Sequence, residues 1–231
     1  MTPDVGPLLA RGRDADVFDL GDGLVLRRAR DGRSLSAEAA VMAAAHAGGV
    51  PVPRVHEVTA DGAVVMDRVS GPTLQVELLR RPWRSRTAAG VLHALHEAVH
   101  AVRAPDALPD VGLPGSALLH LDLHPMNVLL GPDGPVLIDW ANARRGPPGA
   151  DLAMTWLILA TSTVDGPLPI RLGVALLRRR ILAGYEAGLD RAAAMAALPH
   201  LAGRRAADRN VGDAERRRLL AWVSRMGARP C

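Results

Sequence analysis

Short apolar runs alternate with turn residues over positions 1–70, and this pattern predicts two pairs of strands. The runs "DVFDL" at 16–20 and "LVLRRA" at 24–29 flank Gly-Asp-Gly, which is typical of a hairpin. A second pair, at 50–58 and 63–69, is separated by Ala-Asp-Gly. Between the pairs, an Ala-rich stretch at 34–49 opens with Ser and ends with Gly-Gly, which predicts a capped helix.

After Ser70-Gly-Pro-Thr the spacing of apolar residues becomes helical. A Pro- and Gly-rich loop at 104–116 interrupts it, followed by two short apolar runs at 128–130 and 135–139 joined by Gly-Pro-Asp-Gly, which predicts a further hairpin. The sequence therefore predicts an α+β chain. The predicted helices cover residues 74–79, 86–102, 151–160, 170–188, 191–202 and 213–226.

We expect two lobes, because the character of the chain changes near residue 70. Residues 1–69 would form a small antiparallel-sheet lobe that binds a nucleotide, and residues 70–231 a larger helical lobe that carries catalysis and the substrate. A cleft between two such lobes is a usual place for a ligand.

The charge is unevenly distributed along the chain. All 28 basic residues are arginines, and the net charge is +4. Residues 1–140 hold 13 Arg and 17 acidic residues, a net of −4, whereas residues 141–231 hold 15 Arg and 7 acidic residues, a net of +8. A basic half can indicate nucleic-acid binding. Here the arginine runs lie within Leu-rich helical patterns, which favours solvated helix faces, so we expect no nucleic-acid partner.

The single cysteine and the lack of long apolar segments bear on location. Cys231 has no partner for a disulfide within the chain, which is typical of a reducing compartment. The N-terminal residues lack the pattern of a signal peptide, and the most apolar stretch, at 152–160, is too short to span a bilayer. We expect a cytoplasmic protein without a membrane partner. The oligomeric state cannot be predicted.

Candidate chemistry is concentrated in "HLDLHPMNVLL" at 120–130 and "VLIDW" at 136–140. Asp122 and Asn127 have the D-x-x-x-x-N spacing of a kinase catalytic loop, and Asp139 ends the next predicted strand. Oxygen atoms of Asp and Asn suit Mg²⁺. Phosphoryl transfer needs a base, metal ligands and a cation on the phosphates, and this segment supplies the base and the ligands.

These two segments resemble the catalytic motif of aminoglycoside phosphotransferases and related small-molecule kinases, such as choline, homoserine and macrolide kinases. The resemblance extends to "VVMDRVSGPTL" as the hinge, "LHALHEAV" as the helix before the catalytic loop and "GADLAMTWL" as the helix after it. It implies a bilobal protein-kinase-like fold. It also implies transfer of the γ-phosphate of ATP to a hydroxyl group of a small molecule, dependent on Mg²⁺; the residues leave GTP open as the donor.

The resemblance also implies roles for individual residues. Asp122 would be the catalytic base, Asn127 and Asp139 would hold Mg²⁺, and Asp151 would support the catalytic loop. His120 would brace this loop through hydrogen bonds, and His124 could either touch substrate or be structural. The hinge that meets the nucleotide would include Met66, Asp67 and Val69.

The chain departs from the family pattern at several positions. The family lysine on the third strand is absent, and Arg27 is the residue we match to it, with Glu38 as its helix partner. Arginine can bind phosphate in a bidentate fork, but it is bulkier than lysine. Leu121 and Met126 stand where glycines are common, and the nucleotide loop at 11–18 has one Gly. The alternative is therefore a non-catalytic nucleotide-binding or regulatory protein on the same fold.

Two further patterns bear on ligands. His93, His96 and His100 share one face of a predicted helix, but no carboxylate or cysteine pattern accompanies them, so we predict no zinc site. The basic half argues against a polyamine acceptor, and a neutral or anionic alcohol is at least as compatible with it.

Overall fold

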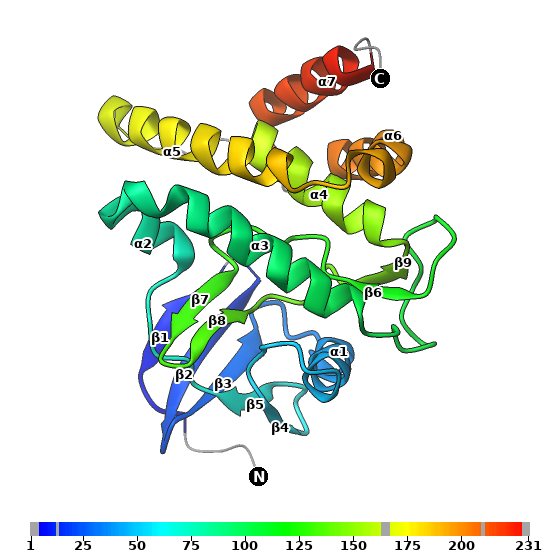
Figure 1. Cartoon of the computed structure of the whole chain (residues 1–231). Coiled ribbons are helices and arrows are strands. Elements are labelled where there is room, and N and C mark those ends of the chain that lie inside the picture. Colours follow the sequence, from blue (N-terminus) through cyan, green and yellow to red (C-terminus); the bar gives the residue numbers. More distant parts are fainter. Residues whose placement is uncertain (1–4, 13, 163–166, 209–210, 228–231) are drawn as a thin grey trace.

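The computed structural model describes residues 5–12, 14–162, 167–208 and 211–227 (Figure 1). Its strands are β1 (Leu8–Arg11), β2 (Ala15–Gly21), β3 (Leu24–Ala29), β4 (Val55–Val58), β5 (Val64–Asp67), β6 (Ala117–Leu119), β7 (Val128–Gly131), β8 (Gly134–Leu137) and β9 (Arg144–Gly146). Its helices are α1 (Ser36–Ala47), α2 (Leu74–Arg80), a 3₁₀ turn (Pro82–Arg84), α3 (Ser85–His100), α4 (Pro148–Thr161), α5 (Leu168–Ala187), α6 (Arg191–Ala207) and α7 (Asp213–Gly227).

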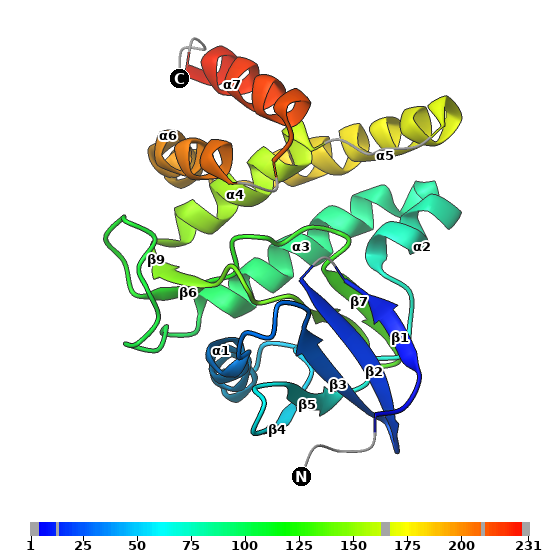
Figure 2. The same ribbon diagram turned by 180° about the vertical axis from the view of Figure 1, so that it is seen from behind.

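The first five strands form one antiparallel sheet in the order β1-β2-β3-β5-β4, with α1 beside it (Figure 2). Both predicted strand pairs are present. The turn between β2 and β3 places Asp22 at φ 49° and Gly23 at φ 76°, the left-handed backbone that tight hairpins need. Strand β1 was not predicted, because its residues are all exposed and it forms only by pairing with β2.

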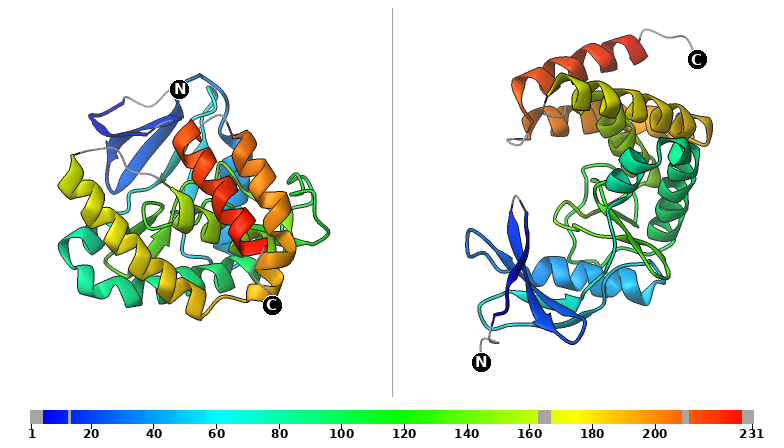
Figure 3. Two further views of the ribbon diagram at one scale, coloured as in Figure 1. Left: turned by 90° about the horizontal axis from the view of Figure 1, so that it is seen from above. Right: turned by 90° about the vertical axis from the view of Figure 1, so that its left-hand side faces the viewer.

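The helices from α2 onward gather at the other end of the molecule, and α3 and α5 pack against one another (Figures 1 and 3). Two small antiparallel pairs, β6 with β9 and β7 with β8, lie between the sheet and these helices. The β7–β8 hairpin was predicted, whereas β6 and β9 were not. Helix α6 continues to Ala207, past the predicted end at residue 202.

One buried apolar cluster joins the sheet side to the helices. It runs from Val25 and α1 through α3 to α4 and α6. The largest side chains that are fully buried are Trp140, Trp156 and Tyr185. Trp140 directly follows Asp139, so the core holds the end of this hairpin in place. Among the described residues, no helix combines the length and apolar character that a membrane crossing requires.

Candidate active site

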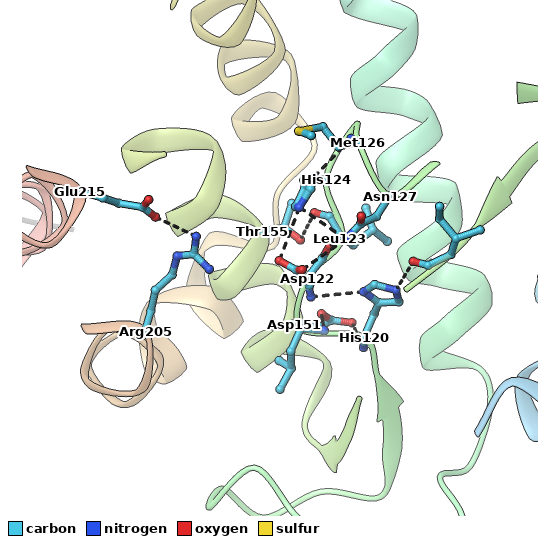
Figure 4. Close-up of polar contacts among 12 residues, drawn as sticks. His120, Asp122, Leu123, His124, Met126, Asn127, Asp151, Thr155, Arg205 and Glu215 are labelled. Atoms are coloured by element: carbon cyan, nitrogen blue, oxygen red, sulfur yellow. Dashed lines mark hydrogen bonds and ion pairs between the residues drawn. The ribbon is translucent and has the colours of Figure 1, made fainter. Parts of the chain in front are cut away.

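Asp122 and Asn127 lie in the loop between β6 and β7 (Figure 4), and Asp139 directly follows Ile138 at the end of β8. The amide of Ile138 donates to the carbonyl oxygen of Asn127 at 2.9 Å, which brings the end of β8 alongside the loop. Asp139 has φ 65°, a left-handed conformation that Asp tolerates better than most residues. The backbone thus brings the three predicted site residues together.

Asn127 is oriented by Asp122. Its side-chain Nδ2 donates to the Asp122 carbonyl oxygen at 2.9 Å and to Asp122 Oδ2 at 3.3 Å. These contacts turn the amide oxygen, Oδ1, away from Asp122. The Asp139 side chain is 45% exposed and has room for a ligand. An amide oxygen and an exposed carboxylate are hard donors that suit Mg²⁺, so the residues fit the metal that the family implies.

Arg27 on β3 lies between Glu38 on α1 and Asp139. Its guanidinium forms an ion pair with Glu38, and its second nitrogen lies 3.4 Å from Asp139 Oδ1. Arg27 and Glu38 are both largely buried, and Glu38 Oε1 also accepts the amide of Trp140 at 3.2 Å. Arg27 is therefore paired with Glu38, as the sequence predicted, and the pair lies directly beside the end of β8.

The carboxylate of Asp122 has an unusual environment. The pKa of Asp122 is raised to about 7. Burial is the main cause and the negative charge of Asp139 adds to it, while the positive charge of Arg205 and the Asn127 hydrogen bond oppose the shift. His124 lies 3.5 Å from Asp122 Oδ1. Burial and the nearby charges of His120 and Arg205 lower the pKa of His124 to about 4, so this imidazole is neutral at pH 7.

Asp151 on α4 holds the N-terminal end of the catalytic loop. It is fully buried and accepts the backbone amides of His120 at 2.9 Å and Leu121 at 2.7 Å. Leu121 has φ 59°, a conformation costing a non-glycine residue about 1–2 kcal/mol. The two hydrogen bonds to Asp151 stabilise this strained turn. Thr155, one helical turn later, donates to the carbonyl oxygen of Leu123 at 2.9 Å.

The histidines of α3 are part of this support. His100 Nε2 lies 3.1 Å and His96 Nδ1 3.6 Å from Asp151 Oδ2, whereas His93 stacks on Tyr185 at 4.6 Å between ring centroids. The sequence showed no carboxylate for these histidines, and the fold supplies one. Because Asp151 already accepts two backbone amides, we interpret the group as a hydrogen-bonding network.

The predicted hinge residues lie at the end of β5 and just after it. Met66 is buried in the core, and the Asp67 carboxylate lies 2.7 Å from His56. The amide of Asp67 donates to the Arg54 carbonyl oxygen, and the next amide, that of Arg68, donates to Gly23. A contact of Asp67 with an adenine base would therefore use its carbonyl group. Val69 is half-buried and packs near Gly131.

A cavity of about 620 Å³ lies beside the catalytic loop, between the sheet side and α6. Sequence reasoning missed the α6 residues in its wall, since paired arginines in a Leu-rich helix look like a solvated face. Its lining includes Leu121, Asn142, Met154, Arg204, Arg205 and Asp208.

Comparison with known protein families gives a match over most of the chain. The family described as the phosphotransferase enzyme family matches residues 6–117 and 112–195. A probable bifunctional tRNA threonylcarbamoyladenosine biosynthesis protein of Methanoculleus marisnigri is 28% identical over 172 residues. That stretch is 67% of this chain but 28% of the relative, so the chain spans less than a third of that protein.

Solved structures share the fold. A thermostable mutant of aminoglycoside phosphotransferase APH(4)-Ia, in complex with AMP-PNP and hygromycin B, has a TM-score of 0.67 at 16% identity, over 98% of this chain and 96% of that one. A choline/ethanolamine kinase family protein from Mesorhizobium loti has a TM-score of 0.57 at 20% identity, over 97% and 89%. The predicted α+β, bilobal kinase-like fold is confirmed.

Proposed function

Because the chain belongs to the phosphotransferase enzyme family, we propose that it transfers the γ-phosphate of ATP, with Mg²⁺, to a hydroxyl group of a small molecule in the cytoplasm. The observation that carries the proposal is spatial. Arg27 and Glu38 are far in sequence from the segment that holds Asp122, Asn127 and Asp139, yet all five residues lie in one connected group. Kinases assemble such a set for phosphoryl transfer.

Each residue has a role in this proposal. Asp122 accepts or orients the proton of the attacking hydroxyl group, since its carboxylate lies next to Asn127 in the same loop. Arg27, held by Glu38, steadies the nucleotide phosphates. Asn127 and Asp139 would hold Mg²⁺, which when bound neutralises charge on the phosphate oxygens. The hinge at Met66, Asp67 and Val69 meets the base.

The proposed division of labour follows the two parts of the chain. Residues 1–69 bind the nucleotide, and residues 70–231 supply catalysis and the acceptor site. The APH(4)-Ia complex contains an ATP analogue together with hygromycin B, which supports a nucleotide donor and a small-molecule acceptor rather than a nucleic acid. GTP remains an alternative donor.

Calorimetric titration tests the nucleotide site. We expect ATP to bind with Mg²⁺ and to bind at least about tenfold more weakly without it or in Asp139→Ala, because a charge-assisted contact is worth about 1.5–3 kcal/mol. Asp133→Ala is the matched control, since Asp133 is an exposed aspartate in the β7–β8 turn. Failure of ATP and GTP to bind under any of these conditions would favour the non-catalytic alternative.

Turnover is the second requirement. ADP formation would be measured with a panel of neutral, anionic and cationic alcohols, using Asp122→Ala as the inactive reference. A protein that binds Mg²⁺–ATP but phosphorylates no alcohol, or one whose turnover survives Asp122→Ala, would contradict the proposal.

A further inference from the structure

The cavity beside the catalytic loop has arginines on its helical wall. Arg204 and Arg205 lie near the C-terminal end of α6 and line the cavity together with Leu121 of the catalytic loop. Arg205 exerts the strongest opposing charge effect on the raised pKa of Asp122, so its guanidinium lies within electrostatic reach of that carboxylate. Figure 4 shows Arg205 reaching from α6, with Glu215 on its far side.

Arg144 and Arg204 are like-charged neighbours that, within the described part of the chain, have no carboxylate counter-ion. Arg144, two residues after the cavity residue Asn142, has its pKa lowered by burial and by the charge of Arg204. Among the described residues, neither Arg144 nor Arg204 forms an ion pair with a carboxylate. Placing two guanidiniums near one another without an anion is unfavourable, and an anionic ligand would relieve it.

Arg205 is only partly neutralised. Its NH2 group pairs with Glu215 at 2.8 Å, while its buried Nε lacks a hydrogen-bond partner among the described residues. A guanidinium presents donors in a fixed fork that matches a carboxylate or a phosphate. Glu215 therefore leaves the guanidinium of Arg205 incompletely satisfied.

Carboxylates also face the cavity and limit its positive charge. Asp208 lines the same wall and raises the pKa of Asp122. Asp14 and Asp31 lie on the sheet side, where Asp31 pairs with the exposed Arg33 at 3.5 Å. The carboxylates on the sheet side are exposed, whereas Arg204 and Arg205 line the helical side next to the catalytic loop, and Arg144 lies within electrostatic reach of Arg204.

We propose that the alcohol phosphorylated by this protein carries an anionic group, a carboxylate or a phosphate, held by Arg204 with support from Arg144 and Arg205. The inference rests on the proposed function, since it names the substrate class of that site. A cationic polyamine would place its ammonium groups beside these guanidiniums and be repelled. The hydroxyl to be phosphorylated lies next to the anion, which places it near Asp122.

A binding experiment tests the anion site without requiring catalysis. Inorganic phosphate would be titrated into the protein at constant ionic strength, and we expect Arg204→Glu to weaken binding about tenfold, the value of one charge-assisted contact. Arg180→Glu, an exposed arginine of α5 outside the cavity lining, is the matched control and should bind phosphate unchanged. Equal affinity in Arg204→Glu and the unmodified protein would overturn the inference.

Matched acceptors distinguish the two kinds of anion. Glycerol, glycerate, glycerol 3-phosphate and a polyamine aminoglycoside would be compared by ADP formation. We expect kcat/KM to be highest for glycerate or for glycerol 3-phosphate, whichever anion the site prefers, and to fall about tenfold for that acceptor in Arg204→Glu. Preference for glycerol or the aminoglycoside would overturn the inference while leaving the phosphotransferase proposal intact. If the protein failed to bind ATP but its binding of phosphate still depended on Arg204, the proposed function would be overturned and the anion site would not.

Discussion

Two aspartates, Asp122 in the catalytic loop and Asp151 on α4 beside it, have opposite pKa shifts. Burial acts on both and favours the neutral acid. In Asp122 it prevails and raises the pKa to about 7. In Asp151 burial is again the largest influence, but the hydrogen bond with His100 and the close approach of His96 lower its pKa well below the ordinary value.

The difference lies in the donors around each carboxylate. Asp151 accepts two backbone amides and has two imidazoles beside it. Asp122 receives one side-chain amide, that of Asn127, and lies near the negative charge of Asp139. A well-satisfied buried carboxylate holds structure, whereas an under-satisfied one is typical of a functional site. The following predictions test this contrast.

The largest effect is expected in turnover on Asp122→Ala. We expect kcat to fall by about 10²–10⁴, the usual contribution of a positioned general base. The free energy of unfolding should be unchanged or raised, because a poorly satisfied buried carboxylate is removed. Kinetics and chemical denaturation on the same preparations measure both, and a large loss of stability would mean that Asp122 is also structural.

Asp151→Ala should show the reverse pattern. Removing this carboxylate leaves two amides and the histidines without their shared acceptor, so we expect the free energy of unfolding to fall by about 3–5 kcal/mol. Denaturant unfolding monitored by tryptophan fluorescence would measure it. A loss below about 1 kcal/mol would be within the range of an ordinary hydrogen bond and would contradict the bracing role.

The pH dependence of stability sharpens the comparison. Burial lowers the folded-state pKa of His96 below its ordinary value of 6.5, although Asp151 opposes this. The unfolded chain therefore binds the proton first, so stability is complete above about pH 6.5 and falls at lower pH, by at most about 1.4 kcal/mol per pH unit for one group. Asp151 stays ionised in this window because its pKa is lowered.

Denaturation at pH 7, 6 and 5 would compare the unmodified protein with His96→Gln. We expect the variant to have a shallower decline in unfolding free energy between pH 7 and 5. Equal slopes in the two proteins would show that His96 is not held neutral by burial.

The smallest effect is expected for Thr155→Val. The hydroxyl group donates to Leu123 at 2.9 Å and also contacts His96 at 3.1 Å. Its replacement by a methyl group of similar shape should lower the free energy of unfolding by about 1–2 kcal/mol and leave ATP affinity unchanged. A change in ATP affinity larger than the change in stability would assign Thr155 a role at the nucleotide site.

The fold was predictable where the pattern is local. The β2–β3 hairpin and the helices α3, α4, α5 and α7 follow from turn residues and apolar spacing. Strands β6 and β9 were not predictable, because each has three residues and pairs with the other across 24 intervening residues, from 120 to 143. Pairing over such a separation depends on the packed core and leaves little trace in the local sequence.

The candidate site, too, has features that the local sequence predicts and contacts that only the folded chain provides. The spacing of Asp122, Asn127 and Asp139 can be read from one continuous segment. The match of Arg27 to the usual lysine can likewise be read from the run that contains it. The contacts of Arg27 with Glu38 and Asp139, and of Asp151 with histidines fifty residues away, exist only in the folded chain.

The sequence by itself determined the resemblance to the family, the order of the main elements and which residues are candidates for phosphoryl transfer, because those depend on residue type and short-range spacing. Tertiary structure alone decided the direction in which the pKa of each of the two buried aspartates is shifted, and which arginines face the cavity. Electrostatic effects depend on distance and on exclusion of water, and both are set only when remote segments pack together.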